Sequence, residues 1–258
     1  MIFEQVATGG CQSYLIGCGD TCAAALIDPE ISQVDHYVAL AARDGLRVRY
    51  VIDTHTHADH FSATREIARQ LNVPVIMHRS SPAPFVDMRL GDGELIVLGK
   101  MRLQAIHTPG HTPACMTHVI GDAAFVGDTL FMPDYGTART DFPGGDARQL
   151  YRSIQRILGL PRDTRLFMCH DYKAPGRDVF AWETTVGGQL DRNIHIGGGV
   201  AEDAYVAMRE ARDATLSVPK LLYPSIQVNL RAGQLPQAEA GGRHFLKIPL
   251  SVPEGSDL

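Results

Sequence analysis

The stretch His55-Thr56-His57-Ala58-Asp59-His60 decides how this 258-residue sequence is interpreted. It follows RVRYVID (residues 47–53), a run typical of a buried strand, and precedes a segment with helical spacing that begins near Phe61. Side chains two residues apart in an extended segment point to the same side, so the first two histidines can face one point in space. The turn into the helix brings the aspartate and the last histidine toward the same region. Imidazoles and carboxylates at this density predict a metal site, and a polar capped turn with solvated histidines is the less favoured interpretation.

Three further residues of the kinds that bind metals also fall at the ends of predicted strands. His111 lies in HTPGHTP (residues 107–113), where Gly110 allows a sharp turn. Asp128 ends AAFVGD (residues 123–128), and His170 ends RLFMCH (residues 165–170). A single aspartate after a strand is more often a cap or turn residue. The repetition of one arrangement along the chain predicts instead that all these side chains belong to one site, at the strand ends where α/β sheets place active sites.

The remaining sequence predicts a layered α/β fold. Strand-like runs separated by Gly-rich turns are typical of an antiparallel meander, and they lie at residues 2–7, 13–17 and 22–28. Helical spacing occurs at residues 31–43, 61–71, 146–158 and 202–211, and further strands are predicted at residues 74–78, 94–99, 101–107 and 115–120. Two halves of this kind suit two sheets packed face to face with helices outside, a four-layer αββα sandwich. We predict a single domain over residues 1–258, in which a C-terminal extension from about residue 175 to 258 packs on the core. The extension contains a Pro-punctuated stretch at residues 221–233.

The composition is that of a globular protein, with 45% hydrophobic and 21% charged residues. A net charge of -5 argues against a nucleic-acid partner. The sequence contains no apolar run of about 18 residues, and MIFEQVATGG at the N-terminus lacks the pattern of a secretion signal. We therefore expect a cytoplasmic protein without a membrane partner. The five cysteines are scattered and odd in number, so they do not predict a disulfide framework.

The combined pattern resembles the metallo-β-lactamase superfamily. HxHxDH, a later histidine in TPGHT, the pair Gly127-Asp128 and the strand-end His170 carry this resemblance, which spans about residues 12 to 172. It implies the αββα fold and a metal centre in the groove between the sheets. The superfamily contains hydrolases with two metals and oxygenases with one. Because all seven ligand residues are present, their number leaves both possibilities open.

The segment after Asp128 resembles the persulfide dioxygenase family in its bacterial form. Thr137-Ala138-Arg139-Thr140-Asp141-Phe142 is similar to the family's G-x-x-R-T-D-F element, Asp171-Tyr172 completes its H-D-Y, and residues 211–233 resemble its C-terminal end. The resemblance implies an enzyme with one Fe(II) per chain that converts glutathione persulfide, O₂ and water to glutathione and sulfite, in sulfide detoxification. It also implies a homodimer.

Site roles follow from the same resemblance. His55, His111 and Asp128 would be the catalytic iron ligands, a set that leaves open positions for the persulfide sulfur and O₂. The other four residues would orient these ligands in an oxygenase, or bind metal themselves in a hydrolase: His57, Asp59, His60 and His170. Arg139 and Tyr172 would contact glutathione. The alternatives are an ion pair between Arg139 and Asp141, and a Tyr172 that only packs.

The main alternative function is a glyoxalase II-type thioesterase that hydrolyses S-acyl glutathione at a centre of two Zn(II). It shares the fold, the ligands and the glutathione moiety. The RTDF element favours the dioxygenase, as does the lack of a clear basic pair in the C-terminal part of the sequence. A non-catalytic metal or persulfide sensor is a third hypothesis, disfavoured because no ligand residue has been lost.

Overall fold

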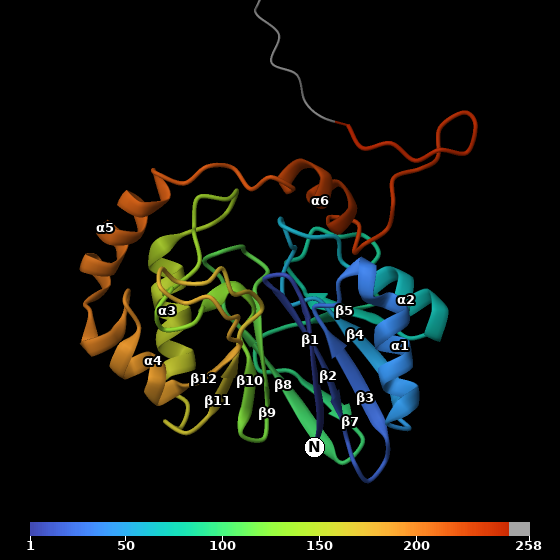
Figure 1. The fold of residues 1–258 in the computed structure, drawn as a ribbon, viewed down its shortest axis with the longest axis horizontal. Helices are drawn as coiled ribbons and strands as arrows, with labels where there is room; N and C mark the ends of the chain where they lie inside the picture. Colours follow the sequence, from blue (N-terminus) through green and yellow to red (C-terminus); the bar gives the residue numbers. More distant parts are fainter. Residues whose placement is uncertain (248–258) are drawn as a thin grey trace, which may run out of the picture.

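Two six-stranded sheets form the centre of the molecule (Figure 1). The computed structural model describes residues 1–247, so residues 248–258 of the predicted C-terminal extension lie outside the described part. In spatial order the first sheet contains β1 (Ile2–Thr8), β2 (Cys11–Gly17), β3 (Ala23–Ile27), β4 (Arg47–Ile52), β5 (Val75–His78) and β6 (Met88–Leu90). The second contains β12 (Glu183–Thr185), β11 (Arg165–Phe167), β10 (Ala123–Phe125), β9 (Met116–Ile120), β8 (Met101–His107) and β7 (Leu95–Leu98).

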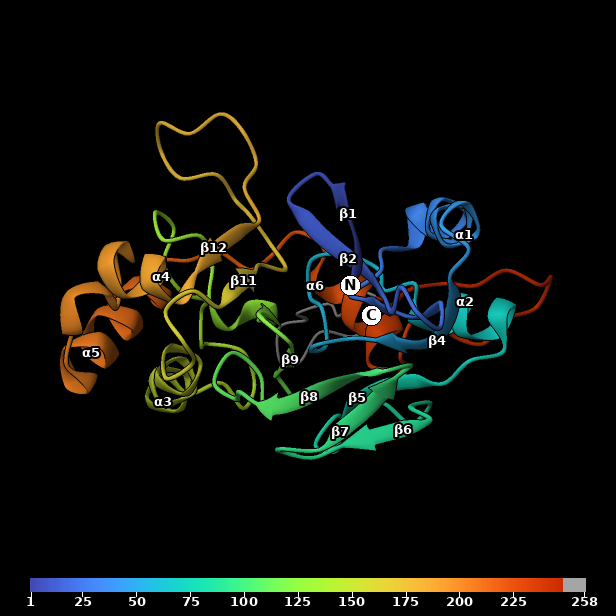
Figure 2. The same ribbon diagram turned by 90° about the horizontal axis from the view of Figure 1, so that it is seen from below.

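Helices cover the outer face of each sheet, which confirms the predicted αββα sandwich. Figure 2 shows α1 (Val34–Arg43) and α2 (Thr64–Leu71) on one side, and α3 (Ala147–Leu158), α4 (Val186–Arg192) and α5 (Glu202–Asp213) on the other. Three clusters of apolar side chains fill the spaces between the sheets and helices of the sandwich. Between the sheets, Tyr14 and Ile52 pack with Phe125 and Phe167, and the two outer layers join each sheet to its helices.

The strand directions bring the predicted site residues to one edge. Strands β3, β4 and β5 are parallel, and β10 is parallel to β11. Since β8 and β10 are both antiparallel to β9, the carboxyl ends of β8, β10 and β11 also lie together. Carboxyl ends of parallel strands are where open α/β sheets bind ligands.

Several element boundaries differ from the prediction. The helix predicted from Phe61 begins at Thr64, because Phe61 and Ser62 are held by Ile31, Glu30 and α6 (Leu222–Asn229). The predicted strand to Asp128 ends at Phe125, and Gly127–Thr129 forms a short 3₁₀ turn with Gly127 at φ +52°. The strand predicted to His170 likewise ends at Phe167.

The C-terminal part contains structure that the sequence analysis missed, namely β12, α4 and α6. Helix α6 lies in the Pro-punctuated stretch, and Pro224 is tolerated there because it occupies the first turn, where a backbone N–H has no intrahelical partner. No helix within residues 1–247 is long and apolar enough to cross a bilayer.

Candidate metal centre

The structure brings all seven predicted ligand residues together at the edge where β4, β8, β10 and β11 end. Six of them are buried, and Asp59 is partly exposed. Their ligand atoms fall into groups, in each of which all atoms lie within 4.8 Å of one another. One group comprises His55, His111 and Asp128. The other predicted ligands lie in neighbouring groups that also contain Cys11, Asp28, Asp53 and Cys169.

In the first group, hereafter the triad, two imidazoles face one carboxylate oxygen. Nε2 of His55 lies 3.8 Å and Nε2 of His111 lies 3.7 Å from Oδ2 of Asp128. These three atoms are close enough to bind a single ion. Two imidazoles and one carboxylate form the donor set of non-haem Fe(II) sites with open positions, and they also suit zinc and manganese.

The hydrogen bonds of His111 fix which of its ring nitrogens is free. Nδ1 of His111 donates to the backbone carbonyl of Arg139 at 2.8 Å. The neutral ring therefore presents the Nε2 lone pair to Asp128, as a metal ligand requires. The turn before His111 packs directly against α3, since a Cβ at Gly110 would lie 2.3 Å from the backbone of Leu150.

His55 is fixed through a relay that ends at Asp28. The hydroxyl of Thr54 donates to Oδ2 of Asp28 at 2.9 Å, so its oxygen accepts from Nδ1 of His55 at 3.0 Å. The backbone N–H of Thr54 also donates to Asp28, at 2.7 Å. Burial raises the pKa of Asp28, but the hydrogen bond from His57 and the charges of nearby imidazoles lower it below its usual range. Asp28 was not predicted from the sequence, although it directly follows the end of β3.

His170 connects the triad to the remaining ligands. Its Nδ1 lies 2.5 Å from Oδ1 of Asp128, and its Nε2 lies 2.7 Å from Oδ2 of Asp59. Asp128 therefore faces the triad with one oxygen and His170 with the other. Burial lowers the pKa of His170, but the two carboxylates outweigh it and hold that pKa well above its usual value.

Buried nitrogens without hydrogen-bond partners indicate that a metal fits here. Within residues 1–247, these include Nδ1 of His57 and Nε2 of His60. Buried polar atoms normally have hydrogen-bond partners. An imidazole nitrogen whose lone pair binds a metal ion does not need such a partner. The residues present therefore fit a metal at this edge.

Asn229 of α6 supports the histidine segment and was also missed. Its side-chain nitrogen donates to the carbonyls of His57 at 2.8 Å and His60 at 2.7 Å, while its oxygen accepts from the N–H of Ser62. The C-terminal helix thus holds three backbone groups of the segment in place. No spacing in the sequence links Asn229 to these residues.

A pocket of about 480 Å³ opens onto the triad. Its walls combine aromatic rings with cations, and they include Phe131, Tyr135, Phe142 and Tyr172 together with Arg139, Arg209, Arg212 and Lys220. Residues 216–221, which connect α5 to α6, supply part of the outer wall. The pocket therefore suits a ligand with anionic groups that extends from the metal.

The two predicted substrate contacts both line this pocket. Arg139 is bound by Asp141 through both carboxylate oxygens at 2.6 Å, and it donates to the carbonyl of Ser217 at 2.9 Å. The ion-pair alternative for Arg139 is thus present in the structure. Tyr172 stacks on His170 with ring centroids 5.8 Å apart, and 46% of its surface is exposed.

Helix α5 holds the loop that carries Arg139. Arg209, 1% exposed, pairs with Asp213 at 2.6 Å and donates to the carbonyl of Thr137 at 3.1 Å. Asp213 accepts from the N–H and the hydroxyl of Thr140 at 2.8 and 2.9 Å. Since the carbonyl of Arg139 lies between these two threonines, the pair on α5 positions the group that orients His111.

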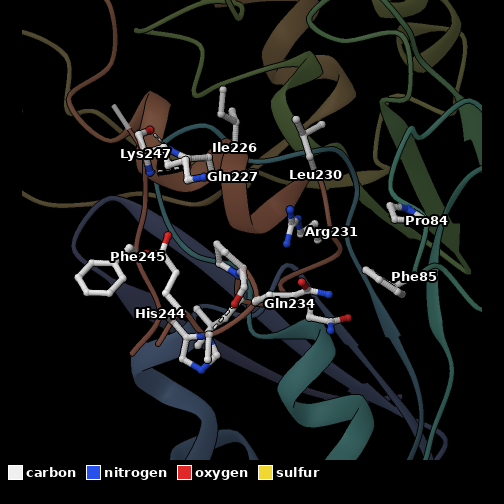
Figure 3. A pocket seen from close by; sticks show the side chains of 15 residues that line it. Pro84, Phe85, Ile226, Gln227, Leu230, Arg231, Gln234, His244, Phe245 and Lys247 are labelled. Atoms are coloured by element: carbon white, nitrogen blue, oxygen red, sulfur yellow. Dashed lines mark hydrogen bonds between the residues drawn. The ribbon is translucent and has the colours of Figure 1, made fainter. Parts of the chain in front are cut away.

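A larger pocket, about 1000 Å³, lies between α6, Pro84-Phe85 and the C-terminal segment (Figure 3). Gln227 of α6 binds the backbone of Lys247 there through both ends of its amide. The lining includes none of the seven ligand residues and neither predicted substrate contact. Size alone therefore does not identify the site, whose chemistry lies in the smaller pocket.

Comparisons with known proteins agree with this geometry. The metallo-beta-lactamase superfamily profile matches residues 6–170. A Burkholderia pseudomallei protein named "Probable metallo-hydrolase" is 46% identical over 93% of this chain and 95% of its own. Glyoxylase B2 of Dictyostelium discoideum is 40% identical over 84% of this chain and 81% of its own. Human persulfide dioxygenase ETHE1 is 37% identical over 62% of this chain and 63% of its own.

Among solved structures, ETHE1 from Myxococcus xanthus superposes with a TM-score of 0.83 at 32% identity, covering 91% of this chain and all of the other. Three relatives named beta-lactamase hydrolase-like proteins are longer, and the chain spans only 62% to 65% of their length.

Proposed function

Because the chain belongs to the metallo-beta-lactamase superfamily, we propose that it is an iron-dependent persulfide dioxygenase. It would oxidise glutathione persulfide with O₂ and water to sulfite and glutathione, with one Fe(II) per chain. The observation that carries this proposal is the division of Asp128, whose Oδ2 faces the triad while Oδ1 is bound by His170. That division favours a single ion held by three ligands. Similarity to the Myxococcus and human proteins supports the same conclusion.

In this proposal the triad would hold the iron through Nε2 of His55, Nε2 of His111 and Oδ2 of Asp128. Bound Fe(II) supplies the one-electron chemistry by which O₂ can react with a persulfide sulfur. The relay from Asp28 and the carbonyl of Arg139 keep both imidazoles in the ligating tautomer. His57, Asp59, His60 and His170 would orient the ligands.

The pocket would bind the glutathione moiety. Its aromatic walls limit access of water to the metal, and its cations match the two carboxylates of glutathione. Because Arg139 is already bound by Asp141, we assign the main electrostatic contact to Arg212 and Lys220, which line the same pocket and are exposed. Tyr172 would contact the substrate beside His170. The cytoplasmic location, the homodimer and the division into a core and a C-terminal extension stay predictions.

A glyoxalase II-type thioesterase with two Zn(II) is the second candidate. It is favoured by the similarity to Dictyostelium glyoxylase B2 and by the unpartnered nitrogens of His57 and His60. These nitrogens would then ligate metal directly, and a metal-activated water would attack the thioester.

One experiment separates the two candidates. Protein purified without added metal is analysed for metal content, and its O₂ uptake and sulfite formation are measured with glutathione persulfide. We expect about one iron per chain with coupled O₂ uptake and sulfite formation. Near two zinc ions per chain, no O₂ uptake and rapid hydrolysis of an S-acyl glutathione would overturn the proposal in favour of the thioesterase.

A further inference from the structure

We propose that Gln189, Asn193 and His195 are positioning residues that set the preference of the pocket for an extended thiol ligand such as the glutathione moiety. These three residues, hereafter the α4 cluster, lie in α4 and directly after it. They act through the backbone of residues 130–137, hereafter the pocket loop. The inference rests on the proposed function in one respect, namely that the pocket binds a glutathione derivative.

The pocket loop carries aromatic side chains that line the pocket. Phe131 and Tyr135 are both part of the lining, and their ring centroids lie 5.7 Å apart. Each ring also lies 5.4 Å from the ring of Tyr172, which stacks on His170. These three rings, hereafter the aromatic trio, therefore form one continuous surface beside the ligand residues. Two of the three depend on the pocket loop for their position.

Two amide side chains of the α4 cluster bind carbonyl groups of the pocket loop. Nε2 of Gln189 donates to the carbonyl of Phe131 at 2.7 Å. Nδ2 of Asn193 donates to the carbonyl of Gly136 at 3.1 Å and also to Oε1 of Gln189 at 2.6 Å. The two amides are 0% and 4% exposed. Loss of either donor would therefore leave a buried carbonyl without this partner, which is costly in the protein interior.

His195 holds the last residue of the pocket loop. Its Nδ1 accepts from the N–H of Thr137 at 3.0 Å, so this nitrogen carries no proton. Burial and the charges of Arg209 and Arg212 lower the pKa of His195 to about 4, which keeps the ring neutral near pH 7. The contact is close, because a Cβ at Gly136 would lie 2.2 Å from the same nitrogen.

The α4 cluster lies outside the metal centre. Its three side chains, all in the described part of the chain, belong to no group of candidate ligand atoms and do not line the pocket. The segment whose carbonyl orients His111 is held separately, through Arg209 and Asp213 on α5. Loss of a contact in the α4 cluster should therefore loosen the aromatic trio and leave the metal bound.

A loosened wall affects long and short ligands differently. Binding to a mobile surface costs the free energy of ordering it, and a preformed surface avoids this cost. A glutathione derivative extends from its sulfur through a glycyl and a γ-glutamyl arm, which would reach the aromatic trio. Cysteine persulfide lacks both arms. We therefore expect the α4 cluster to favour glutathione persulfide over cysteine persulfide.

The first measurement needs no substrate and compares amide hydrogen exchange in the pocket loop. Gln189→Met and His195→Leu should speed exchange there about tenfold, because the loss of a buried hydrogen bond corresponds to roughly that factor. Exchange in β8 should not change. His195→Asn should restore slow exchange, since the side-chain oxygen of asparagine can accept from Thr137 in place of Nδ1. Circular dichroism of all variants checks folding.

The second measurement is the kinetics of two persulfides. Gln189→Met and His195→Leu should raise KM for glutathione persulfide about tenfold, with kcat, metal content and KM for cysteine persulfide unchanged. His195→Asn should recover the wild-type KM. The matched control is Tyr151→Phe, which removes a hydrogen bond to the carbonyl of Val200 at 2.9 Å without touching the pocket loop. It should alter neither exchange in the loop nor KM.

Either of two results would overturn the inference. One is wild-type exchange of the pocket loop in both variants, and the other is an equal loss of activity toward the two persulfides, which a general loss of stability would produce. Failure of the proposed function has a different signature, namely a wild-type protein that does not turn over persulfide. The kinetic comparison would then use S-acyl glutathione and S-acyl N-acetylcysteine, with the same expected results.

Discussion

The wall of the pocket that contains the triad, hereafter the inner wall, and the wall that contains residues 212–221, hereafter the outer wall, are built in different ways. On the inner wall, each triad residue is buried and held by a specific partner: His55 by Thr54, His111 by the carbonyl of Arg139, and Asp128 by His170. On the outer wall, residues 212–221 are largely exposed. Nearby arginines are paired, as in Arg139–Asp141 and Arg209–Asp213, but no ion pair of Arg212 or Lys220 is found in residues 1–247.

This difference suggests that the inner wall determines metal binding and that the outer wall determines the affinity for substrate. A network of buried polar groups tolerates little change, because each lost partner leaves an unsatisfied group in a low-dielectric interior. An exposed connecting segment tolerates substitution at small cost in stability. We therefore expect changes on the inner wall to affect metal binding and folding, and changes on the outer wall to affect mainly the apparent affinity for substrate.

The largest effect is expected at the triad. Asp128→Ala removes a proposed ligand and should weaken metal binding by more than about 100-fold, since even changes behind the ligands cost roughly 10–100-fold. Metal analysis after dialysis and kcat/KM for the persulfide measure this loss. Asp203→Ala, at an exposed acid of α5, is the control and should retain full metal content. Normal iron content in Asp128→Ala would show that Asp128 is not a ligand.

Breaking the pair on α5 should have the next largest effect. Asp213→Ala leaves the buried guanidinium of Arg209 unpaired, which typically costs about 3–5 kcal/mol of stability. Denaturant unfolding of the metal-free protein measures this loss, and His111 should bind metal less well because the loop carrying Arg139 is released. The double variant Arg209→Met/Asp213→Leu should recover much of the stability. A loss below about 1 kcal/mol in the single variant would contradict a structural role for the pair.

The next prediction concerns His118, which is as buried as the triad histidines but is not one of the predicted ligands. His118 is 0% exposed and neither ring nitrogen has a hydrogen-bond partner within residues 1–247. Burial lowers its pKa from 6.5 to about 4. The unfolded chain then takes up this proton near pH 6.5 while the folded chain does so only near pH 4, so stability is full above the former value and is lost as pH falls toward the latter.

His118→Leu should remove this part of the acid sensitivity. The wild-type protein is expected to lose up to about 3 kcal/mol more than the variant over that range, at about 1.4 kcal/mol per pKa unit. Denaturant unfolding at several pH values provides the measurement, with metal content at neutral pH unchanged as the control. Parallel pH profiles for the two proteins would show that His118 is not held neutral by burial.

A smaller effect is expected behind His55. Thr54→Val removes the hydroxyl that accepts from Nδ1 of His55, and it should lower metal affinity by roughly 10–100-fold. Thr56→Val is a matched control, because the hydroxyl of Thr56 has no hydrogen-bond partner within the described residues. Competition with a chelator measures both affinities. Equal affinities in the two variants would rule out the relay from Asp28.

The smallest effect is expected on the outer wall. Lys220→Ala and Arg212→Ala should each raise KM for glutathione persulfide by up to about fivefold, the size of an exposed ion pair, with kcat unchanged. Added salt should reduce the difference from wild type. Arg69→Ala, at an exposed cation of α2 outside the pocket, serves as the control. A fall in kcat with unchanged KM would place these cations in the chemistry instead of in binding.

Much of the fold and the convergence of the ligand residues could be predicted from the sequence. Strand and helix periodicity is local, and the six-residue histidine segment together with three later strand ends placed the site at one sheet edge. The supporting residues could not be found in this way. Asn229 acts on a backbone group 167 positions earlier in the chain, and Arg209 and Asp213 have the spacing of an ordinary exposed ion pair on a helix. Only the tertiary packing shows that these groups are buried.

The attachment of the loop carrying Arg139 to α5, and of the histidine segment to α6, has a consequence for fragments of the chain. Both helices follow every proposed ligand in the sequence. A fragment that ends before α5 would contain all seven ligand residues, yet the carbonyls that orient His111 and the histidine segment would not be held. We therefore expect such a fragment to bind metal less tightly than the chain that includes both helices.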